Sequence, residues 1–144
     1  MQDQELQRVF LFKLETAAKQ FRKYKNRVFK QEGIDITSDQ WILLKNISEV
    51  EGINQIDLAK RSQKEAASVT RTLDILERKG WIERLTDPNS RREYNLCITE
   101  EGKAMVEKIL PIALQTRAQA SKGMTISQIE ILNDLLDQIT QNLH

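Results

Sequence analysis

The stretch from Asn54 to Thr99 constrains the fold most, because within it the pattern of apolar residues changes from helical to strand-like. Residues 64–79 place four apolar side chains in one arc of a helical wheel drawn at about 100° per residue, namely Ala66, Val69, Leu73 and Leu76. Asn54 can cap a shorter helix over 55–61, and residues 62–64 supply the turn between the two helices. The sequence places the first residue of the second helix only to within two or three positions.

The opposite side of the 64–79 helix is basic and carries short side chains. Lys64, Arg71 and Arg78 recur at intervals of seven, so they line up along the helix with little drift. The short residues beside this line are Ala67, Ser68 and Thr70. A packed back and a basic front suit the major groove of duplex DNA, which admits one helix at close approach. An ordinary solvated face explains the same pattern, so the helix alone leaves both interpretations open.

A two-stranded hairpin with a basic tip is expected after this helix. Gly80 is a helix-stop signal, and the short runs 81–82 and 94–98 are rich in strand-forming residues. The segment between them, Asp87-Pro88-Asn89-Ser90, has turn chemistry and leads directly into Arg91 and Arg92. Two arginines at a hairpin tip beside a basic helix favour a probe of the DNA minor groove over a merely soluble loop.

Residues 69–102 resemble the recognition helix, the wing and the following helix start of MarR-type transcriptional regulators. The family's Leu-x-x-Lys-Gly and Leu-Thr-x-x-Gly patterns fall on Leu76, Lys79 and Gly80, and on Ile98, Thr99 and Gly102, with Ile98 in place of Leu. The wing departs from the family's Asp-x-Arg pattern. Its Arg falls on Arg92, but its Asp, which usually braces that arginine, falls on Ser90. The stiffness of the wing is therefore open, with Asp87 or Glu93 as alternative braces.

Amphipathic helices are expected on both sides of this lobe. The first runs over 4–30, and a second begins at Thr37, which has capping-box spacing to Gln40, and ends near 49–51. Thr99 can cap a helix to about residue 121, which Pro111 should kink or interrupt, and Thr125 can cap the last helix. The predicted fold class is mainly α, a winged helix-turn-helix with about six helices and one two-stranded β-hairpin wing.

The chain is expected to form one domain over residues 1–144. Within it, 4–36 and 100–144 would be dimerisation helices around a DNA-binding lobe over 37–99, because their apolar stripes exceed what one small lobe can cover. The net charge of +1 does not suggest a polyanion partner, but its distribution does. Residues 60–92 hold nine Lys and Arg against five Asp and Glu, and residues 13–30 hold seven against one.

Enzymatic function is not expected, because the parts for it are missing from the sequence. The single histidine is His144 at the C-terminus, and no metal cluster, cofactor motif or phosphate-binding loop can be assembled. The single cysteine, Cys97, lies in a predicted strand and is more simply a strand residue than a redox sensor. No apolar run is long enough to cross a membrane, and no secretion signal is visible, so a cytoplasmic protein is expected.

The resemblance implies a homodimeric repressor that binds double-stranded DNA at a pseudo-palindromic operator. Its DNA-binding residues would be Lys64, Ala67, Ser68, Thr70, Arg71, Arg91 and Arg92. It also implies a small aromatic or anionic effector, held between the first, second and fifth helices near Arg22, Tyr24 and Trp41. Trp41 is more simply a core residue. The alternative is a winged-helix protein-interaction module that does not bind DNA, for which a cationic front would be unnecessary.

Overall fold

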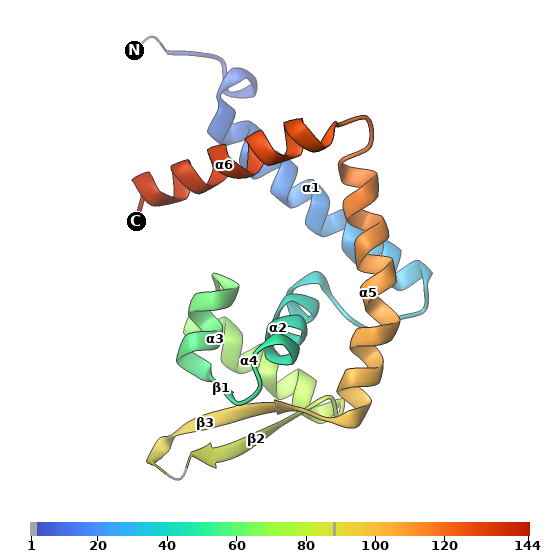
Figure 1. The fold of residues 1–144 in the computed structure, drawn as a ribbon, viewed down its shortest axis with the longest axis vertical. Coiled ribbons are helices and arrows are strands. Elements are labelled where there is room, and N and C mark those ends of the chain that lie inside the picture. Colours follow the sequence, from blue (N-terminus) through green and yellow to red (C-terminus); the bar gives the residue numbers. More distant parts are fainter. Residues whose placement is uncertain (1–2, 88) are drawn as a thin grey trace.

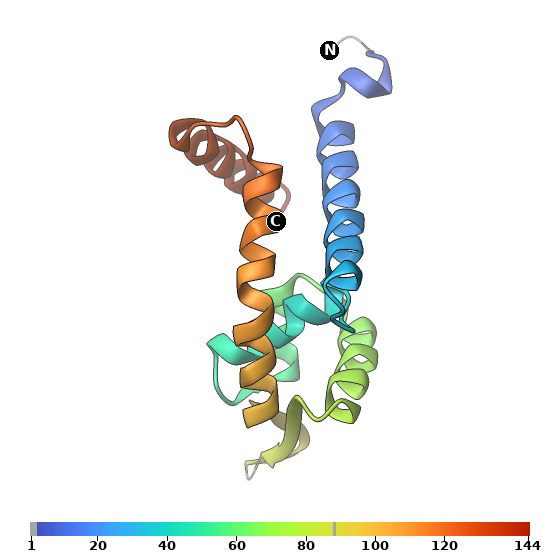
Figure 2. The same cartoon turned by 90° about the vertical axis from the view of Figure 1, so that its right-hand side faces the viewer.

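The computed structural model describes residues 3–87 and 89–144, with the side chains of residues 87 and 90–93 outside this description. The elements, in chain order, are a 3-10 helix η1 (Leu6–Arg8), α1 (Phe10–Gln31), α2 (Ser38–Glu49), β1 (Ile53–Asn54), α3 (Gln55–Ser62), α4 (Ala66–Arg78), β2 (Ile82–Asp87), β3 (Ser90–Ile98), α5 (Glu100–Ala120) and α6 (Ile126–Asn142). Helices α2 to α4 and the strands form a lobe, from which α1 and α5 rise side by side (Figures 1 and 2). Helix α6 lies at the far end of α5.

The fold class predicted from the sequence is confirmed, with one addition to the sheet. Strands β2 and β3 form the expected antiparallel hairpin, and both are longer than the short runs that predicted them. A two-residue strand, β1, pairs with the other edge of β3, with Ile53 opposite Leu96, and makes the order β1-β3-β2. Two residues are too short to show an alternating pattern, which is why the sequence indicated only two strands.

The predicted helix caps are present at each of the four predicted starts. Thr37 and Thr125 each form a full capping box, with Gln40 and Gln128 respectively. Asn54 accepts a hydrogen bond from the backbone of Asp57, and Thr99 accepts one from Gly102. These short-range signals therefore set the starts of α2, α3, α5 and α6.

Three local predictions are corrected by the structure. Helix α1 begins at Phe10 rather than near residue 4, because Val9 is extended and a separate 3-10 turn precedes it. Helix α4 begins at Ala66 rather than Lys64, because Gln63 adopts a left-handed conformation with φ 55° that ends α3. Helix α5 continues through Pro111 without interruption, since Ile109 and Ala113 are buried against the core and hold its path.

One hydrophobic core holds the lobe together and extends to the base of α1 and α5. It contains the apolar faces of α2 and α4, Ile82 of β2 and Leu96 of β3, with Phe29 of α1 and Ile109 of α5 joining from above. In contrast, α6 contributes no buried residue. No helix within the described part of the chain is long and apolar enough to cross a bilayer.

Candidate nucleic-acid interface

The back of α4 is fixed by burial, and this determines which side faces outward. Val69, Leu73 and Leu76 are completely buried, as the helical wheel predicted. Ala66, which the wheel placed with them, is exposed because it lies in the first turn, beyond the edge of the core. Burial of three large apolar side chains stabilises the position of α4 by roughly 1.5–3 kcal/mol for each side chain. The opposite face of the helix therefore points away from the lobe.

This outward face carries the predicted short and basic side chains. Ala67, Thr70 and Arg71 are exposed, and Ser68 is half-buried. Arg71 Nη2 lies 3.4 Å from Ser68 Oγ, so the guanidinium is held only weakly along the helix. Thr70 Oγ1 accepts a hydrogen bond from Gln55 Nε2 at 3.0 Å, which links the front of α4 to the first turn of α3. The face thus offers a weakly held cation among short side chains, which suits base-edge contact in a groove.

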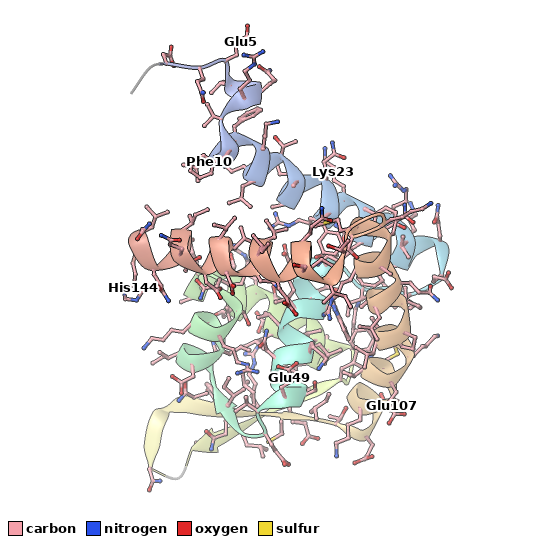
Figure 3. All side chains as sticks on the ribbon, turned by 45° about the horizontal axis from the view of Figure 1, so that its top comes forward. Glu5, Phe10, Lys23, Glu49, Glu107 and His144 are labelled. Atoms are coloured by element: carbon pink, nitrogen blue, oxygen red, sulfur yellow. The ribbon has the colours of Figure 1, made fainter. Side chains whose placement is uncertain are left out.

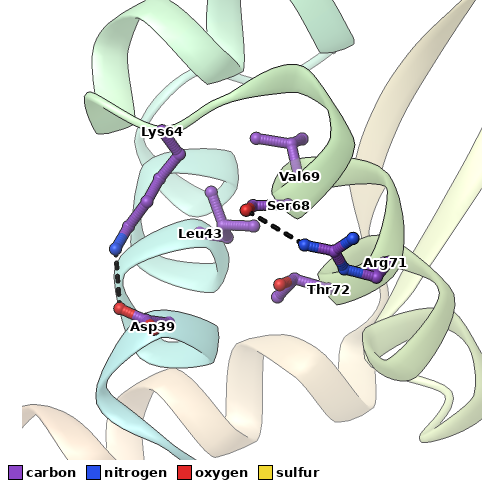
Figure 4. Close-up of a pocket in the computed structure, with 7 residues that line it drawn as sticks. All are labelled: Asp39, Leu43, Lys64, Ser68, Val69, Arg71 and Thr72. Atoms are coloured by element: carbon purple, nitrogen blue, oxygen red, sulfur yellow. Dashed lines mark hydrogen bonds and ion pairs between the residues drawn. The ribbon is translucent and has the colours of Figure 1, made fainter.

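Lys64 lies beside this face but not on the helix. It occupies the turn before α4, and its Nζ is 2.6 Å from Asp39 Oδ1 in the first turn of α2. Together with Ser68 and Arg71, this pair lines a hollow of about 220 Å³ between α2 and α4 (Figure 4). The hydrogen bond from Lys64 is the main reason why the pKa of Asp39 is lowered from its usual value.

The wing extends away from the lobe beside α4 (Figure 1). Its strand β2 is tied to α4 by Arg84, which forms ion pairs with Asp74 and Glu77. The side chains of Arg91 and Arg92 lie outside the described residues, although their backbone belongs to β3. Their role in DNA binding therefore stays a prediction from the sequence.

The three residues expected near an effector lie in different surroundings. Arg22 Nε is 3.8 Å from Asp39 Oδ1, between α1 and the lobe. Tyr24 lies in an open groove between α1 and α5, where Arg27 stacks on its ring at 5.4 Å. Trp41 is only 3% exposed and belongs to the hydrophobic core. The structure therefore brings Arg22 to the junction between the lobe and the arm, which consists of α1, α5 and α6, but it does not bring the three side chains together.

The same junction holds cations that sequence reasoning missed. The pKa of Lys25 is lowered, first by burial and then by the positive charge of Arg117, with Arg22 and Lys64 adding to the effect and Asp39 opposing it. Helix α1 and the turn before α4 thus bring Arg22, Lys25 and Lys64 near the carboxylate of Asp39, and the charge of Arg117 on α5 reaches Lys25. Residue spacing gives no signal for this cluster, because its members lie far apart in the sequence. Within residues 3–87 and 89–144, no group of His, Cys, Asp or Glu side chains is arranged to hold a metal ion.

Comparison with known proteins agrees with this geometry. The MarR family model matches residues 36–94, which span the core of the lobe, the helix-turn-helix and most of the wing. A MarR mutant from E. coli complexed with operator DNA is 26% identical, with a TM-score of 0.83 over 96% of this chain and 99% of that chain. Wild-type MarR from E. coli in its apo form is also 26% identical, with a TM-score of 0.71 over 88% of this chain and 93% of that one.

A third structure supports the fold at lower identity. The S. aureus MepR–DNA complex is 22% identical, with a TM-score of 0.84 over 93% of this chain and 98% of that chain. The family match, the buried back of α4 and the adjoining wing all indicate the same class of protein. Regulators of this class are not enzymes. Residues 36–94 of the chain match the MarR family model, and the whole chain has the fold of the MarR-type winged-helix regulators to which it is similar.

Proposed function

We propose that this regulator acts as a homodimeric repressor, which places one α4 helix from each subunit in successive major grooves of a pseudo-palindromic operator. The observation that carries the DNA-binding role is the orientation of α4, whose apolar back is completely buried and whose short and basic front is exposed beside the wing. In this arrangement Arg71, Ser68, Thr70 and Ala67 approach base edges and Lys64 approaches a phosphate. Arg91 and Arg92 enter the flanking minor groove.

The arm helices support the dimer. Helix α6 has 17 residues and none of them is buried, although Ile131, Leu132 and Leu135 are apolar and 45–57% exposed. Phe10, at the outer end of α1, is 63% exposed and stands beyond the lobe (Figure 3). A helix of this length gains little stability in water unless its apolar face is covered. A second copy of the chain, presenting the same stripes around a two-fold axis, would cover both surfaces.

An anionic effector fits the junction between arm and lobe. The cations of Arg22, Lys25 and Arg117 lie there with Asp39 as an opposing carboxylate, so a bound anion would offset the repulsion that adds to burial in lowering the pKa of Lys25. Because α1 and α5 belong to the arm and Asp39 to the lobe, an anion held there would change how the arm meets the lobe. In the proposed dimer this change would alter the spacing of the DNA-binding lobes of the two subunits. We attribute release of DNA to this altered spacing.

Binding of duplexes taken from the DNA that flanks the reading frame tests this function. We expect tighter binding than to a scrambled duplex, two subunits per site, and half-sites roughly 34 Å apart along the duplex. Sedimentation of a monomer at micromolar concentration, with one subunit bound per site, would contradict the dimer. A failure to bind any duplex at low salt would instead favour a protein-interaction module.

Matched variants on α6 separate the dimer from general stability. Leu135→Glu places a charge on the exposed apolar stripe, whereas Asn133→Glu places the same charge on an exposed polar position of the same helix. We expect the first variant to dissociate and to lose operator binding, and the second to remain dimeric.

The effector is tested separately. Salicylate-like aromatic acids should raise the melting temperature of the protein and release the operator. Acids that do neither would remove the effector from the proposal.

A further inference from the structure

Asp39 is an acidic residue beside the proposed DNA-binding face of α4. It lies in the first turn of α2 and lines the same hollow as Lys64, Ser68 and Arg71 (Figure 4). Its Oδ1 atom is 2.6 Å from Lys64 Nζ and 3.8 Å from Arg22 Nε. One carboxylate therefore pairs both with Lys64, beside the proposed DNA-binding face, and with Arg22 of the arm helix α1.

The contact with Lys64 is the stronger of the two. The Lys64 side chain is only 20% exposed, so it lies along the lobe toward α2 instead of extending into solvent. The short hydrogen bond from Lys64 holds the pKa of Asp39 below its usual value, and the carboxylate is therefore charged at neutral pH. In this arrangement the charge of Lys64 is neutralised before any DNA arrives.

We propose that Asp39 is a positioning residue that competes with the DNA phosphates for Lys64, and thereby limits the electrostatic strength of DNA binding. A phosphate offers the same kind of anionic oxygen as the carboxylate, so Lys64 can exchange one for the other. Asp39 then keeps Arg22 as its partner. This inference rests on the proposed role of the α4 front in DNA binding.

The competition has a consequence for counterions. When a free lysine neutralises a phosphate, a condensed cation leaves the DNA, and the slope of log K against log salt changes by about 0.9. When Lys64 leaves Asp39 to do so, the carboxylate keeps only its longer contact with Arg22 and takes up part of a screening cation, so the two effects largely cancel. Lys64 therefore adds little to the salt dependence in the natural protein, and it adds a full counterion once Asp39 is neutral.

The test is a double-mutant cycle of Asp39→Asn and Lys64→Met, measured by fluorescence anisotropy with a non-specific duplex between 50 and 200 mM salt. We expect Asp39→Asn to steepen the slope by about 0.9 for each bound subunit, so that affinity falls more across this range than in the natural protein, by about 3.5-fold per subunit and about 12-fold for a bound dimer. Lys64→Met should abolish that gain in the Asp39→Asn protein and should change the slope little in the natural one.

Glu100→Gln is the matched control. Glu100 also lies in the first turn of a threonine-capped helix and pairs with a lysine, Lys103, at 3.2 Å, but it does not line the hollow. We expect its slope to equal that of the natural protein. Melting curves of all variants verify that each remains folded.

Two results would overturn the inference while leaving the proposed function intact. One is normal DNA binding by the natural protein with an unchanged slope for Asp39→Asn. The other is a steeper slope for Asp39→Asn that persists in the double variant, since the effect would then come from general charge and not from Lys64. Absence of DNA binding by the natural protein would overturn both proposals.

Discussion

Arg84 Nη2 lies 2.5 Å from Asp74 Oδ1, so strand β2 of the wing is joined to helix α4 by a charged hydrogen bond. The Arg84 side chain is only 18% exposed. Its Nε is 3.7 Å from Glu77 Oε2, which is too far for a hydrogen bond, and this buried atom has no hydrogen-bond partner among the described side chains. A single guanidinium therefore links the wing to helix α4, in addition to the packing of Ile82 against the apolar face of that helix.

We predict that Arg84→Ala destabilises the lobe by about 1–3 kcal/mol, because it removes a charged hydrogen bond and leaves Asp74 and Glu77 without their shared cation. Urea unfolding measures the loss. Arg84→Lys is the control, since it keeps the charge but not the planar fork, and its loss should be smaller. A midpoint for Arg84→Ala equal to that of the natural protein would show that the ion pair contributes nothing.

A second prediction concerns the joint between wing and arm at Gly102. A Cβ atom there would lie 2.1 Å from the carbonyl oxygen of Trp81 and 2.7 Å from Ile98 Cγ1, so backbone would have to move. We expect Gly102→Ala to cost about 1–3 kcal/mol through overpacking, in spite of the better helix propensity of alanine. Thermal unfolding measures the cost, and Lys103→Ala on the exposed side of the same turn should be nearly neutral.

Short-range chemistry explains why so much of the fold follows from the sequence. The capping pairs Thr37–Gln40 and Thr125–Gln128 each act within a single turn, and the stripe of Val69, Leu73 and Leu76 follows from helical periodicity alone. The strand β1 escaped prediction because it exists only through pairing with β3. A strand of two residues is set by tertiary contact and not by local preference.

The candidate site likewise combines residues that local patterns predict with contacts that only the tertiary structure creates. Arg71 and its short neighbours were predicted because they share one helical face. The contacts of Asp39 with Arg22 and Lys64, and of Arg84 with Asp74, join residues that are 10 to 25 positions apart, and no spacing rule connects them. Such pairs depend on the angles at which helices pack, which a single sequence does not encode in a readable pattern.

A third prediction follows from the lowered pKa of Asp39. A carboxyl whose pKa is lower in the folded than in the unfolded protein stabilises the fold at pH values above its ordinary pKa of 3.8. That stability is lost as the pH falls through this value toward the folded pKa. We expect the natural protein to exceed Asp39→Asn in unfolding free energy at pH 7 by less than about 1 kcal/mol, since solvent screens this half-exposed pair. The difference should shrink as the pH falls below 3.8 toward the folded pKa, and a difference that grows with acidity would contradict the assignment.

A fourth prediction concerns the wing arginine. Arg92→Ala should weaken binding to most duplexes and flatten the slope of log K against log salt by about 0.9 per subunit, because an arginine in the minor groove mainly responds to the negative potential there.

A variant of the neighbouring Ser90 tests the brace of this arginine. Ser90→Asp restores the acidic residue of the family pattern and should leave affinity equal or better, since a braced arginine is organised before binding. Several-fold weaker binding of Ser90→Asp at low salt would show that repulsion from the phosphates dominates.

The last prediction separates the two arginines on the line along α4. Arg71 lies midway along the helix, and within the described residues its side-chain hydrogen bond is the long one to Ser68 Oγ, so its guanidinium is available to a base edge. Arg78 lies in the last turn, and its Nε donates to the backbone oxygen of Asp74 at 3.3 Å, which directs it along its own helix. Arg71→Ala should therefore cost about 1–3 kcal/mol in operator binding and relax the preference at one base pair, while Arg78→Ala should lower affinity slightly for all sequences. Binding measured with a set of single-base operator variants distinguishes these effects. If Arg78→Ala relaxes the sequence preference and Arg71→Ala does not, the C-terminal end of α4 enters the groove, and the docking of the helix is the reverse of the one proposed.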